Sequence, residues 1–467
     1  MSRASYVAGL LRPVVIRELR LADHGLELLP RDPASFTPEP DGPGLLLGPD
    51  RAANCAEIRR YSPRDAQRYP EYERLLERVA VTLEPWLDAP PPRSVAHALP
   101  LLAAGASRLG RALPRAWRLL RGAAGPILEA WFESEPLRAT LATDAIIGAW
   151  AGPSSPGSGY VLLHHVMGET GGRRGAWAYA RGGMGAISAA LASAARAAGA
   201  TIRCEAPVAR IRTRHGRVVG VTLANGEEID APVVVANPDP RRTLLDLVGA
   251  SALPRSLREG LEALDFRSPV MKINVALDRL PVFRRRPRNG AYLRGTIHLG
   301  ASTLAELEAS FAAARAGHLP ERPMIELTIP SVIDQTLAPP GRHVASLFVQ
   351  HVPYAPAGGD WEQLREAFAE RVFALVDEHA PGFSASILHR DVLAPPDLER
   401  VFGISGGNIF HGAMSPDRLW WRRPLPGLGR YATPIRGLYL CGAGTHPGGG
   451  VMGACGRNAA TAILSGG

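Results

Sequence analysis

The chain has 467 residues, more than one ordinary hydrophobic core holds, so we expect two intertwined domains. Hydrophobic residues make up 46% and charged residues 21% of the sequence, proportions typical of a globular protein. No uncharged apolar run reaches the roughly 18 residues of a membrane-spanning helix. The net charge of +9 comes from scattered arginines, with Lys272 the sole lysine, and this pattern argues against nucleic-acid binding.

Four cysteines, none in a C-x-x-C pair, predict neither a disulfide framework nor a redox-active disulfide. We therefore expect a reducing compartment, the cytoplasm. The preference for Arg, Ala, Gly and Pro indicates a GC-rich coding sequence and a bacterial source. Three arginines precede Glu18, as in a mitochondrial transit peptide, but we interpret these residues as the start of the folded protein. For a eukaryotic relative we expect mitochondria.

The first clear helix is expected to begin at Ser62 and Pro63, which suit its N-cap and first turn, and to end near Leu87, before three consecutive prolines. A basic amphipathic stretch follows over 99–121. Its arginines recur at three- and four-residue steps, which places them on one helical stripe: Arg108, Arg111, Arg115, Arg118 and Arg121. Two interpretations stay open, a helix lying on an anionic membrane surface or the solvated face of a cap-domain helix.

The region from 179 to 237 predicts a helix over Ala186–Ala198, a strand over Ala200–Cys204 and three short β segments. These segments are divided by His215-Gly216 and by Asn225-Gly226. The second pair predicts a type I′ hairpin turn, in which both central residues need a positive φ. A continuous apolar run, Val233–Asn237, is typical of a strand buried on both faces.

Within about 265–400, strands are predicted over 270–277, 324–329 and 344–351, together with one helix whose apolar stripe is Leu364, Phe368, Val372 and Leu375. The C-terminal segment predicts a strand over 437–441, a glycine-rich turn and a helix through Ile463.

The glycine-rich turn, Gly442–Gly453, carries the clearest chemistry. Glycines this dense between a strand and a helix allow backbone N–H groups to approach a flat or anionic ligand without Cβ clashes. The N-terminus of the following helix adds positive partial charge at the same place. These features favour a nucleotide or flavin cofactor.

The stretch from Arg436 to Gly453, with 179–191, 207–237 and 406–412, resembles the phytoene-desaturase-like FAD-dependent oxidoreductases. Among these it is most similar to the subgroup called pyridine nucleotide-disulfide oxidoreductase domain-containing protein 2. The resemblance implies FAD, with Val208 beside the adenine, the strand ending at Asn237 beneath the cofactor, and Gly442 and Ala443 near the pyrophosphate. It also implies that Gly450, Val451 and Met452 touch the isoalloxazine, and that Gly444 and Gly453 belong to the same cofactor-binding segment. The positions implied near the flavin or substrate are Gly182, Gly183, Met184, His411 and His446.

This family begins with a strand, a G-x-G-x-x-G turn, a helix and a second strand, a unit that the sequence lacks before Met1. We expect its loss to leave strand edges unpaired and FAD binding weak. Gly183-x-Gly185-x-x-Ser188, followed by Glu205, imitates such a fingerprint, but its third glycine is replaced and no clear buried strand precedes it.

The resulting expectation is an α/β protein. Segments 1–60, 176–265 and 401–467 would form an N-terminally truncated, parallel-sheet FAD domain, interleaved with an α+β substrate domain built from a helical part, 61–175, and a sheet part, 266–400. The expected function is removal of hydride from a C–H bond of a hydrophobic small molecule. The alternative is a degenerate, non-catalytic binding or regulatory protein of the same fold. No metal site and no catalytic residue are predicted, and the substrate, the electron acceptor and the oligomeric state stay open.

Overall fold

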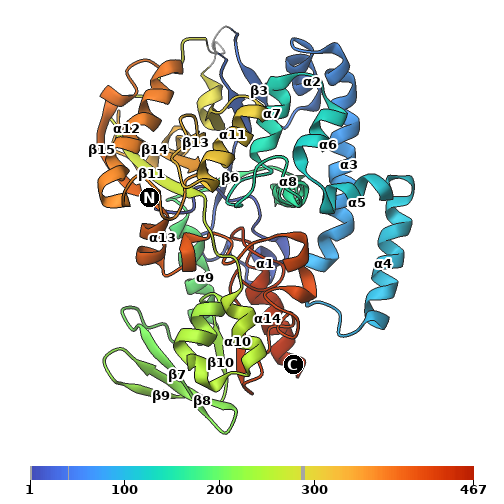
Figure 1. Ribbon diagram of the computed structural model, residues 1–467, viewed down its shortest axis with the longest axis vertical. Coiled ribbons are helices and arrows are strands. Elements are labelled where there is room, and N and C mark those ends of the chain that lie inside the picture. Colours follow the sequence, from blue (N-terminus) through green and yellow to red (C-terminus); the bar gives the residue numbers. More distant parts are fainter. Residues whose placement is uncertain (1–2, 40–41, 286–289, 467) are drawn as a thin grey trace.

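A computed structural model describes residues 3–39, 42–285 and 290–466 (Figure 1). A large sheet occupies one side of the upper part of the molecule in this view, and a group of helices lies beside it. A β-meander, a parallel strand pair and the C-terminal helix form the lower part. Residues from both ends of the chain meet where these parts join.

The large sheet has seven strands in the order β15-β11-β14-β13-β12-β2-β3. All neighbours are antiparallel except β12 and β2. Helix α12 (Trp361–His379) packs its apolar stripe against this sheet. The strands are β2 (Ser35–Thr37), β3 (Leu45–Leu47), β11 (Val270–Leu277), β12 (Thr296–Gly300), β13 (Met324–Thr328), β14 (His343–Gln350) and β15 (Ile387–Leu393). The three strands and the helix predicted here are confirmed.

The helical part surrounds a second apolar core. Its longest member, α3 (Pro63–Leu87), begins and ends where the sequence predicted. The Ser62 hydroxyl accepts a hydrogen bond from the Asp65 N–H at 3.0 Å, so the predicted cap is present. The other helices are α2 (Arg51–Arg59), α4 (Val95–Leu109), α5 (Leu113–Arg121), α6 (Ala124–Trp131), α7 (Glu135–Thr143) and α8 (Ser158–Val166), with α11 (Leu304–Arg315) close by.

The lower part joins two segments that are distant in sequence. Strand β10 (Val234–Ala236) pairs in parallel with β16 (Leu438–Leu440), and their apolar residues share one cluster. The meander of β7 (Val208–Arg214), β8 (Arg217–Leu223) and β9 (Glu228–Asp230) attaches through the Val218 N–H, which donates to the Arg436 carbonyl at 2.9 Å. The helices of this part are α9 (Gly185–Ala197), α10 (Arg255–Glu262) and α14 (Ala454–Leu464).

Three local predictions are wrong. The run 233–237 is not buried on both faces, because Val233 and Val235 are 46% and 45% exposed. Residues 200–204 form no strand, because they run over the surface with every residue exposed. The turn with two positive φ values lies at His215 (φ 49) and Gly216 (φ 70), whereas at Asn225-Gly226 only the glycine has a positive φ. The His215-Gly216 pair therefore has the type I′ signature that was expected one turn later.

The N-terminal segment is shared between the parts of the molecule. Helix α1 (Pro13–Glu18) and β1 (Leu28–Pro30) lie with β6 (Ala178–Ala180), which β1 pairs antiparallel, whereas β2 and β3 complete the large sheet. The remaining elements are short: β4 (Glu169–Thr170), β5 (Arg173–Arg174), α13 (Pro395–Phe402), the π-helix η2 (Arg242–Gly249) and several 3-10 turns. Within the described residues, no helix has the length and hydropathy that crossing a bilayer requires.

Candidate flavin and substrate site

The carboxyl ends of β10 and β16 meet at a turn made of Gly442, Ala443 and Gly444. A Cβ on Gly442 would lie 1.9 Å from the Asn237 carbonyl oxygen, so only glycine permits this contact. Asn237 is exposed, and Val235 on the same strand is 45% exposed. The turn and the strand end thus form an open surface at the carboxyl edge of a parallel pair, where α/β proteins bind nucleotides. The residues present fit contact with one side of an FAD molecule.

The second half of the glycine-rich segment packs more tightly. A Cβ on Gly450 would come within 2.5 Å of Leu10 and 3.2 Å of the His164 ring. Met452 is buried beside Leu10, and its carbonyl accepts the Arg12 N–H at 3.0 Å. The N-terminal segment therefore covers one side of the positions predicted to touch the isoalloxazine.

Val451 differs from these neighbours. It is 44% exposed and has a φ of 56°, an uncommon and strained conformation for a β-branched residue. Gly453, at the start of α14, is exposed as well. Val451 and Gly453 are thus the members of this half that remain open to a ligand.

A cavity of about 320 Å³ lies next to the glycine-rich turn, and Gly444 and His411 both line it. Much of its wall is apolar, with Trp150, Val161, Leu264, Phe410 and Met414. Its polar side chains include Asp265, Arg267, Asn408, Asp417, Arg418 and Arg423. The structure therefore brings two of the sequence-predicted site residues into one cavity wall.

Arg423 links the cavity wall to the glycine-rich turn and was not identified from the sequence. Its guanidinium, only 2% exposed, donates to the Ala443 carbonyl at 2.9 Å, to the Phe410 carbonyl at 2.6 Å and to the Thr445 carbonyl at 3.1 Å. Burial lowers its pKa to about 10, so the side chain still carries a positive charge at neutral pH. A buried arginine bound to several backbone carbonyls is visible only once the loops are folded together.

The three histidines nearest this region differ in their contacts. His164 Nε2 lies 2.9 Å from the Gly449 carbonyl, and burial together with His165 lowers its pKa to about 3. His446 Nε2 lies 2.6 Å from the Trp86 carbonyl, and burial lowers its pKa to about 4. Burial also lowers the pKa of His411, whose buried Nδ1 has no hydrogen-bond partner within the described part of the chain. All three are neutral at neutral pH, and His411 alone lines the cavity.

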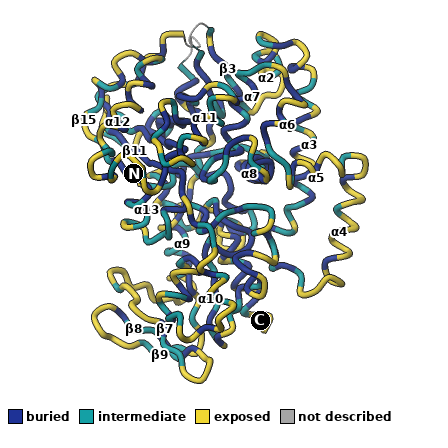
Figure 2. Tube along the Cα trace, in the orientation of Figure 1, coloured by how far each residue is buried: buried dark blue, intermediate teal, exposed yellow. Residues whose placement is uncertain are grey.

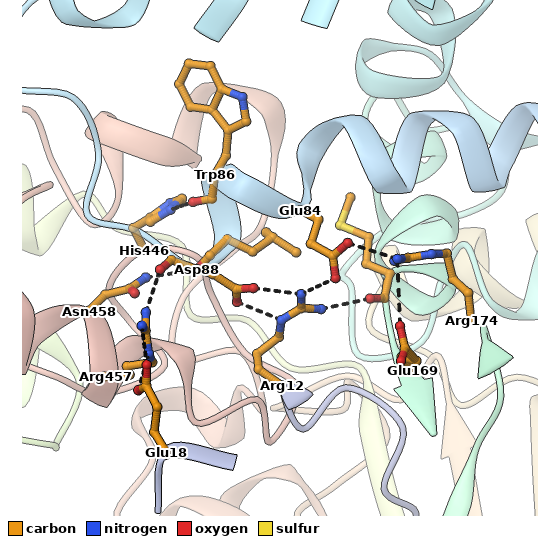
Figure 3. Close-up of polar contacts among 12 residues, drawn as sticks. Arg12, Glu18, Glu84, Trp86, Asp88, Glu169, Arg174, His446, Arg457 and Asn458 are labelled. Carbon is orange, nitrogen blue, oxygen red and sulfur yellow. Dashed lines mark hydrogen bonds and ion pairs between the residues drawn. The ribbon is translucent and has the colours of Figure 1, made fainter. Parts of the chain in front are cut away.

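The C-terminal segment also completes the end of α3 (Figure 3). The carbonyls of Trp86, Leu87 and Asp88, which a helix end leaves without intrahelical donors, accept hydrogen bonds from His446, Asn458 and Arg457 respectively. His446 was predicted near the flavin or substrate, and the structure places its ring at this helix end.

Arg12 anchors the same region from the N-terminal side (Figure 3). Its guanidinium, 2% exposed, binds both carboxylate oxygens of Asp88 at 2.8 and 2.9 Å and Glu84 at 2.6 Å. Glu84 also pairs with Arg174 at 2.9 Å. These ion pairs bind the N-terminal segment to α3 and to the β4–β5 hairpin.

A buried polar cluster lies at the large sheet. The Tyr6 hydroxyl donates to Glu326 at 2.5 Å, and the Lys272 ammonium lies 5.1 Å from the Tyr6 ring centroid and bonds Ser346. Burial lowers the pKa of Lys272 to about 7 and raises the pKa of Glu326 to about 7. In the sequence Lys272 is notable only as the sole lysine, and no role was predicted for it.

Residues 182–184, which were predicted to lie near the flavin or substrate, reach this cluster. Gly183 and Met184 line a small pocket together with Tyr6 and Ser346. Gly182 donates its backbone N–H to Asp334 at 2.6 Å. Val208 begins β7 and is 38% exposed. It lies at the opposite end of this strand from the turn that contacts Arg436, and it lines neither cavity.

Among the described residues, no group of three or more His, Cys, Asp or Glu side chains is arranged to hold a metal ion.

The parallel pair, the glycine-rich turn and the adjoining cavity define a flavoprotein type of oxidoreductase. Residues 117–464 match the model of the flavin containing amine oxidoreductase family. The chain belongs to this family. The flavin cofactor expected from the sequence follows from that membership.

The curated relatives include mammalian and bacterial proteins. The mouse pyridine nucleotide-disulfide oxidoreductase domain-containing protein 2 is 48% identical over 99% of this chain and 84% of its own length. A limonene dehydrogenase component of Castellaniella defragrans is 27% identical over 96% of this chain and 82% of its own length. Hydroxyneurosporene desaturase of Cereibacter sphaeroides is 29% identical over 95% of this chain and 83% of its own length. The family resemblance inferred from the sequence is thereby confirmed, whereas the bacterial source is not supported, because the 48% identical relatives are mammalian.

A solved structure supports the fold. Cyclohexylamine oxidase from Brevibacterium oxydans superposes with a TM-score of 0.54 at 16% identity, covering 100% of this chain and 88% of its own. The predicted α/β, FAD-binding type of fold is confirmed.

Proposed function

We propose that the protein is an FAD-dependent dehydrogenase or desaturase that removes hydride from a C–H bond of an apolar small molecule. The observation that carries this proposal is the cavity beside the glycine-rich turn, whose wall combines Trp150, Val161, Leu264, Phe410 and Met414 with a neutral histidine. Apolar side chains of this kind suit the hydrocarbon part of a ligand, and the polar side chains of the same wall would face its polar end. The names of two relatives specify limonene and hydroxyneurosporene, both largely hydrocarbon, as the molecules on which those proteins act.

FAD fits the open surface at the carboxyl ends of β10 and β16. Asn237 and the turn Gly442–Gly444 would contact its pyrophosphate region, and Val451 would face the ring. When bound, the flavin supplies a two-electron acceptor that takes hydride at N5. The residues of this chain would orient the substrate next to it and exclude water.

His411 would remove the proton that accompanies hydride loss. Forming a carbon–carbon double bond requires hydride to leave one carbon and a proton to leave its neighbour. The imidazole of His411 lines the cavity, its lowered pKa keeps it unprotonated at neutral pH, and its Nδ1 lacks a hydrogen-bond partner among the described residues. It is therefore available as a proton acceptor.

Arg423 would position the reacting groups without taking part in proton transfer. It donates to the carbonyls of Phe410 and Gly412, which flank His411, and to the carbonyl of Ala443 in the glycine-rich turn. The proton acceptor and the predicted cofactor-binding turn are thus held by one guanidinium.

The test is anaerobic mixing of the FAD-loaded protein with limonene and with a long polyene, followed by the loss of oxidised-flavin absorbance. We expect reduction by at least one of these hydrocarbons, with His411→Asn slowing it about 100-fold and removing the acid limb of the pH–rate profile. His389→Asn, at an exposed position on β15, serves as the matched control and should leave the rate unchanged. An FAD-loaded protein that neither hydrocarbon reduces would contradict the proposal.

A non-catalytic binding role is the second candidate, because Leu10 and His164 fill the space beside Gly450 and Met452 is buried against Leu10. Such a protein would bind an apolar ligand in the cavity without reducing flavin. Equilibrium binding of limonene in the absence of any flavin spectral change would favour this binding role.

For both candidate functions we expect no cysteine-dependent reduction of disulfides by NADPH, since the sequence has no C-x-x-C pair.

A further inference from the structure

Helix α4 is apolar but almost fully exposed. Of its fifteen residues, Val95–Leu109, only Ala98 and Leu109 are buried. Val95 is 75% exposed, Leu99 58% and Leu102 51%. Figure 2 shows exposed positions along nearly the whole helix, at the edge of the molecule. A helix at a protein surface ordinarily turns such side chains toward the core, so this one presents an apolar face without a partner among the described residues.

Helix α5 extends this surface and fixes it to the protein. Ala116 and Leu119 are buried in the helical core, and the helix packs against α8, whose residues Ser158 and Val161 line the cavity. On its outer side Leu113 is 41% and Trp117 57% exposed. The Arg121 guanidinium lies 5.2 Å from the Trp117 ring centroid. An aromatic side chain exposed beneath a cation is suited to the boundary between water and lipid.

The same segment carries only positive charge. Residues 89–128 include six arginines and no aspartate or glutamate. Arg115 pairs with Glu71 at 2.9 Å. Within residues 3–39, 42–285 and 290–466, no carboxylate forms an ion pair with the other five: Arg93, Arg108, Arg111, Arg118 and Arg121. The surface therefore combines exposed apolar side chains with a cluster of uncompensated cations.

We propose that α4 and α5 dock the protein on the surface of an anionic lipid bilayer. Helix α4 has fifteen residues, fewer than the roughly 20 needed to span the hydrocarbon core, so it lies in the plane of the interface with Leu99, Leu101 and Leu102 in the acyl boundary. The arginines bind the phosphate and carboxylate groups of the lipids. The mode is peripheral, and it places α5, which packs against the buried helix α8 of the cavity wall, next to the bilayer.

Charge and shape favour lipid over a protein partner. A deformable surface with many anions accommodates five cations without requiring a partner carboxylate at each position. An apolar helix with small residues on several sides, such as Ala103, Ala104 and Ala106, is suited to insertion among acyl chains.

The test is flotation of the purified protein with vesicles of phosphatidylcholine alone and of phosphatidylcholine with about 30% phosphatidylserine. We expect binding only to the anionic vesicles, weakened by raised salt. The triple variant Arg108→Gln/Arg111→Gln/Arg118→Gln should lower the partition coefficient about 100-fold, because each basic residue near an anionic surface contributes roughly 1 kcal/mol. The matched control is Arg17→Gln/Arg59→Gln/Arg196→Gln, which removes the same charge from exposed positions elsewhere. Once the effect of the lower net charge is corrected for, its partition coefficient should stay within about 3-fold of the wild-type value.

The apolar contribution is tested separately with Leu99→Ser/Leu102→Ser, compared with Leu388→Ser at another exposed leucine. We expect the first to lose binding at least about 10-fold and the second to retain it. Because the arginine variants change exposed residues only, they test the proposal even if the leucine variant fails to fold. Wild-type protein that does not float with anionic vesicles, or equal loss with both arginine triples, would overturn the proposal. A dimer that Leu99→Ser/Leu102→Ser dissociates, with no vesicle binding, would assign the surface to a second copy of the chain instead.

Discussion

Two consecutive helices of this protein, α3 and α4, differ in almost everything except the residue that caps them. Each begins at a capping serine, Ser62 or Ser94, but α3 buries nine of its residues and α4 two. Side chains from residues 446–458 cap the C-terminus of α3. Helix α4 instead lies at the edge of the molecule (Figure 1), and its Leu99, Leu101 and Leu102 are exposed. The difference teaches that position relative to other elements, and not apolar composition, determines what a helix contributes to stability.

The largest expected effect is at the ion pairs that hold α3. Arg12→Met removes the cation that neutralises Asp88 and Glu84 and should lower the free energy of unfolding by about 3–4 kcal/mol. Chemical denaturation measures this change. Arg64→Met, which removes an exposed pair with Glu133, is the control and should cost about 0–1 kcal/mol. Equal losses for both variants would show that burial of Arg12 carries no special weight.

The comparison is tested most directly by one leucine from each helix. Leu76 on α3 is 5% exposed, so Leu76→Ala should leave a cavity and cost about 2–3 kcal/mol. Leu102→Ala on α4 should change stability by less than about 0.5 kcal/mol, because the side chain is already in water. The measurement is urea denaturation without lipid. A cost at Leu102 similar to that at Leu76 would mean that α4 packs against protein in solution.

The stability that the hydrogen bond between His446 and the C-terminus of α3 contributes should depend on pH. Burial lowers the pKa of His446 in the folded protein to about 4, below its ordinary 6.5, so the unfolded chain binds more protons between these values. The stability contributed by neutral His446 is therefore present above pH 6.5 and is lost as pH falls toward 4, by about 2 kcal/mol between pH 7 and pH 5. His446→Gln should flatten the stability–pH curve by that amount, and the exposed His389→Gln should not. Parallel stability–pH curves for His446→Gln and wild type would contradict the assignment of this pH dependence to His446.

The smallest effect compares the two capping serines. Ser62 accepts from Asp65 N–H at 3.0 Å and donates to Glu133 at 2.7 Å. The exposed Ser94 accepts from His97 N–H at the longer distance of 3.4 Å, and its hydroxyl lies 2.8 Å from His97 Nδ1. Ser62→Ala should cost about 1–2 kcal/mol and Ser94→Ala about 0.5 kcal/mol. Thermal unfolding of the two variants provides the measurement, and a reversed order would show that α4 contributes more to the global fold than its burial indicates.

These helices also show how far sequence reasoning extends. The start and end of α3 were predictable, because Ser62, Pro63 and the prolines after Leu87 act locally. The arginines of 99–121 predicted a surface position, but the exposure of the leucines on α4 was not predicted, since apolar residues in a helix are more often buried. The strand predicted at 200–204 and the type I′ turn predicted at Asn225 were wrong, because the first segment is fully exposed and adopts no strand, and only Gly226 of the second has a positive φ.

Part of the candidate site was likewise predictable from the sequence, and part was not. The glycine-rich turn and its parallel strands were predictable from local pattern, and Gly444 and His411 do line one cavity. Arg423, Lys272 and Glu326 were not identified as site residues, because their significance depends on partners 20, 74 and 320 residues away: the Ala443 carbonyl oxygen, Ser346 and Tyr6. Single charged residues carry little signal until the fold shows that they are buried.

The end of α3 has a consequence for synthesis of the protein. Its last carbonyls need donors that lie 360 to 371 residues further along the chain. At roughly 5–20 residues per second, a ribosome needs on the order of 20–70 s to deliver those donors after α3 has emerged. During that interval the helix end must be hydrated or covered by other molecules, and these hydrogen bonds can form only after residue 458 has been translated. Nascent-chain truncations before His446 should therefore be far more sensitive to protease than chains that extend past Asn458.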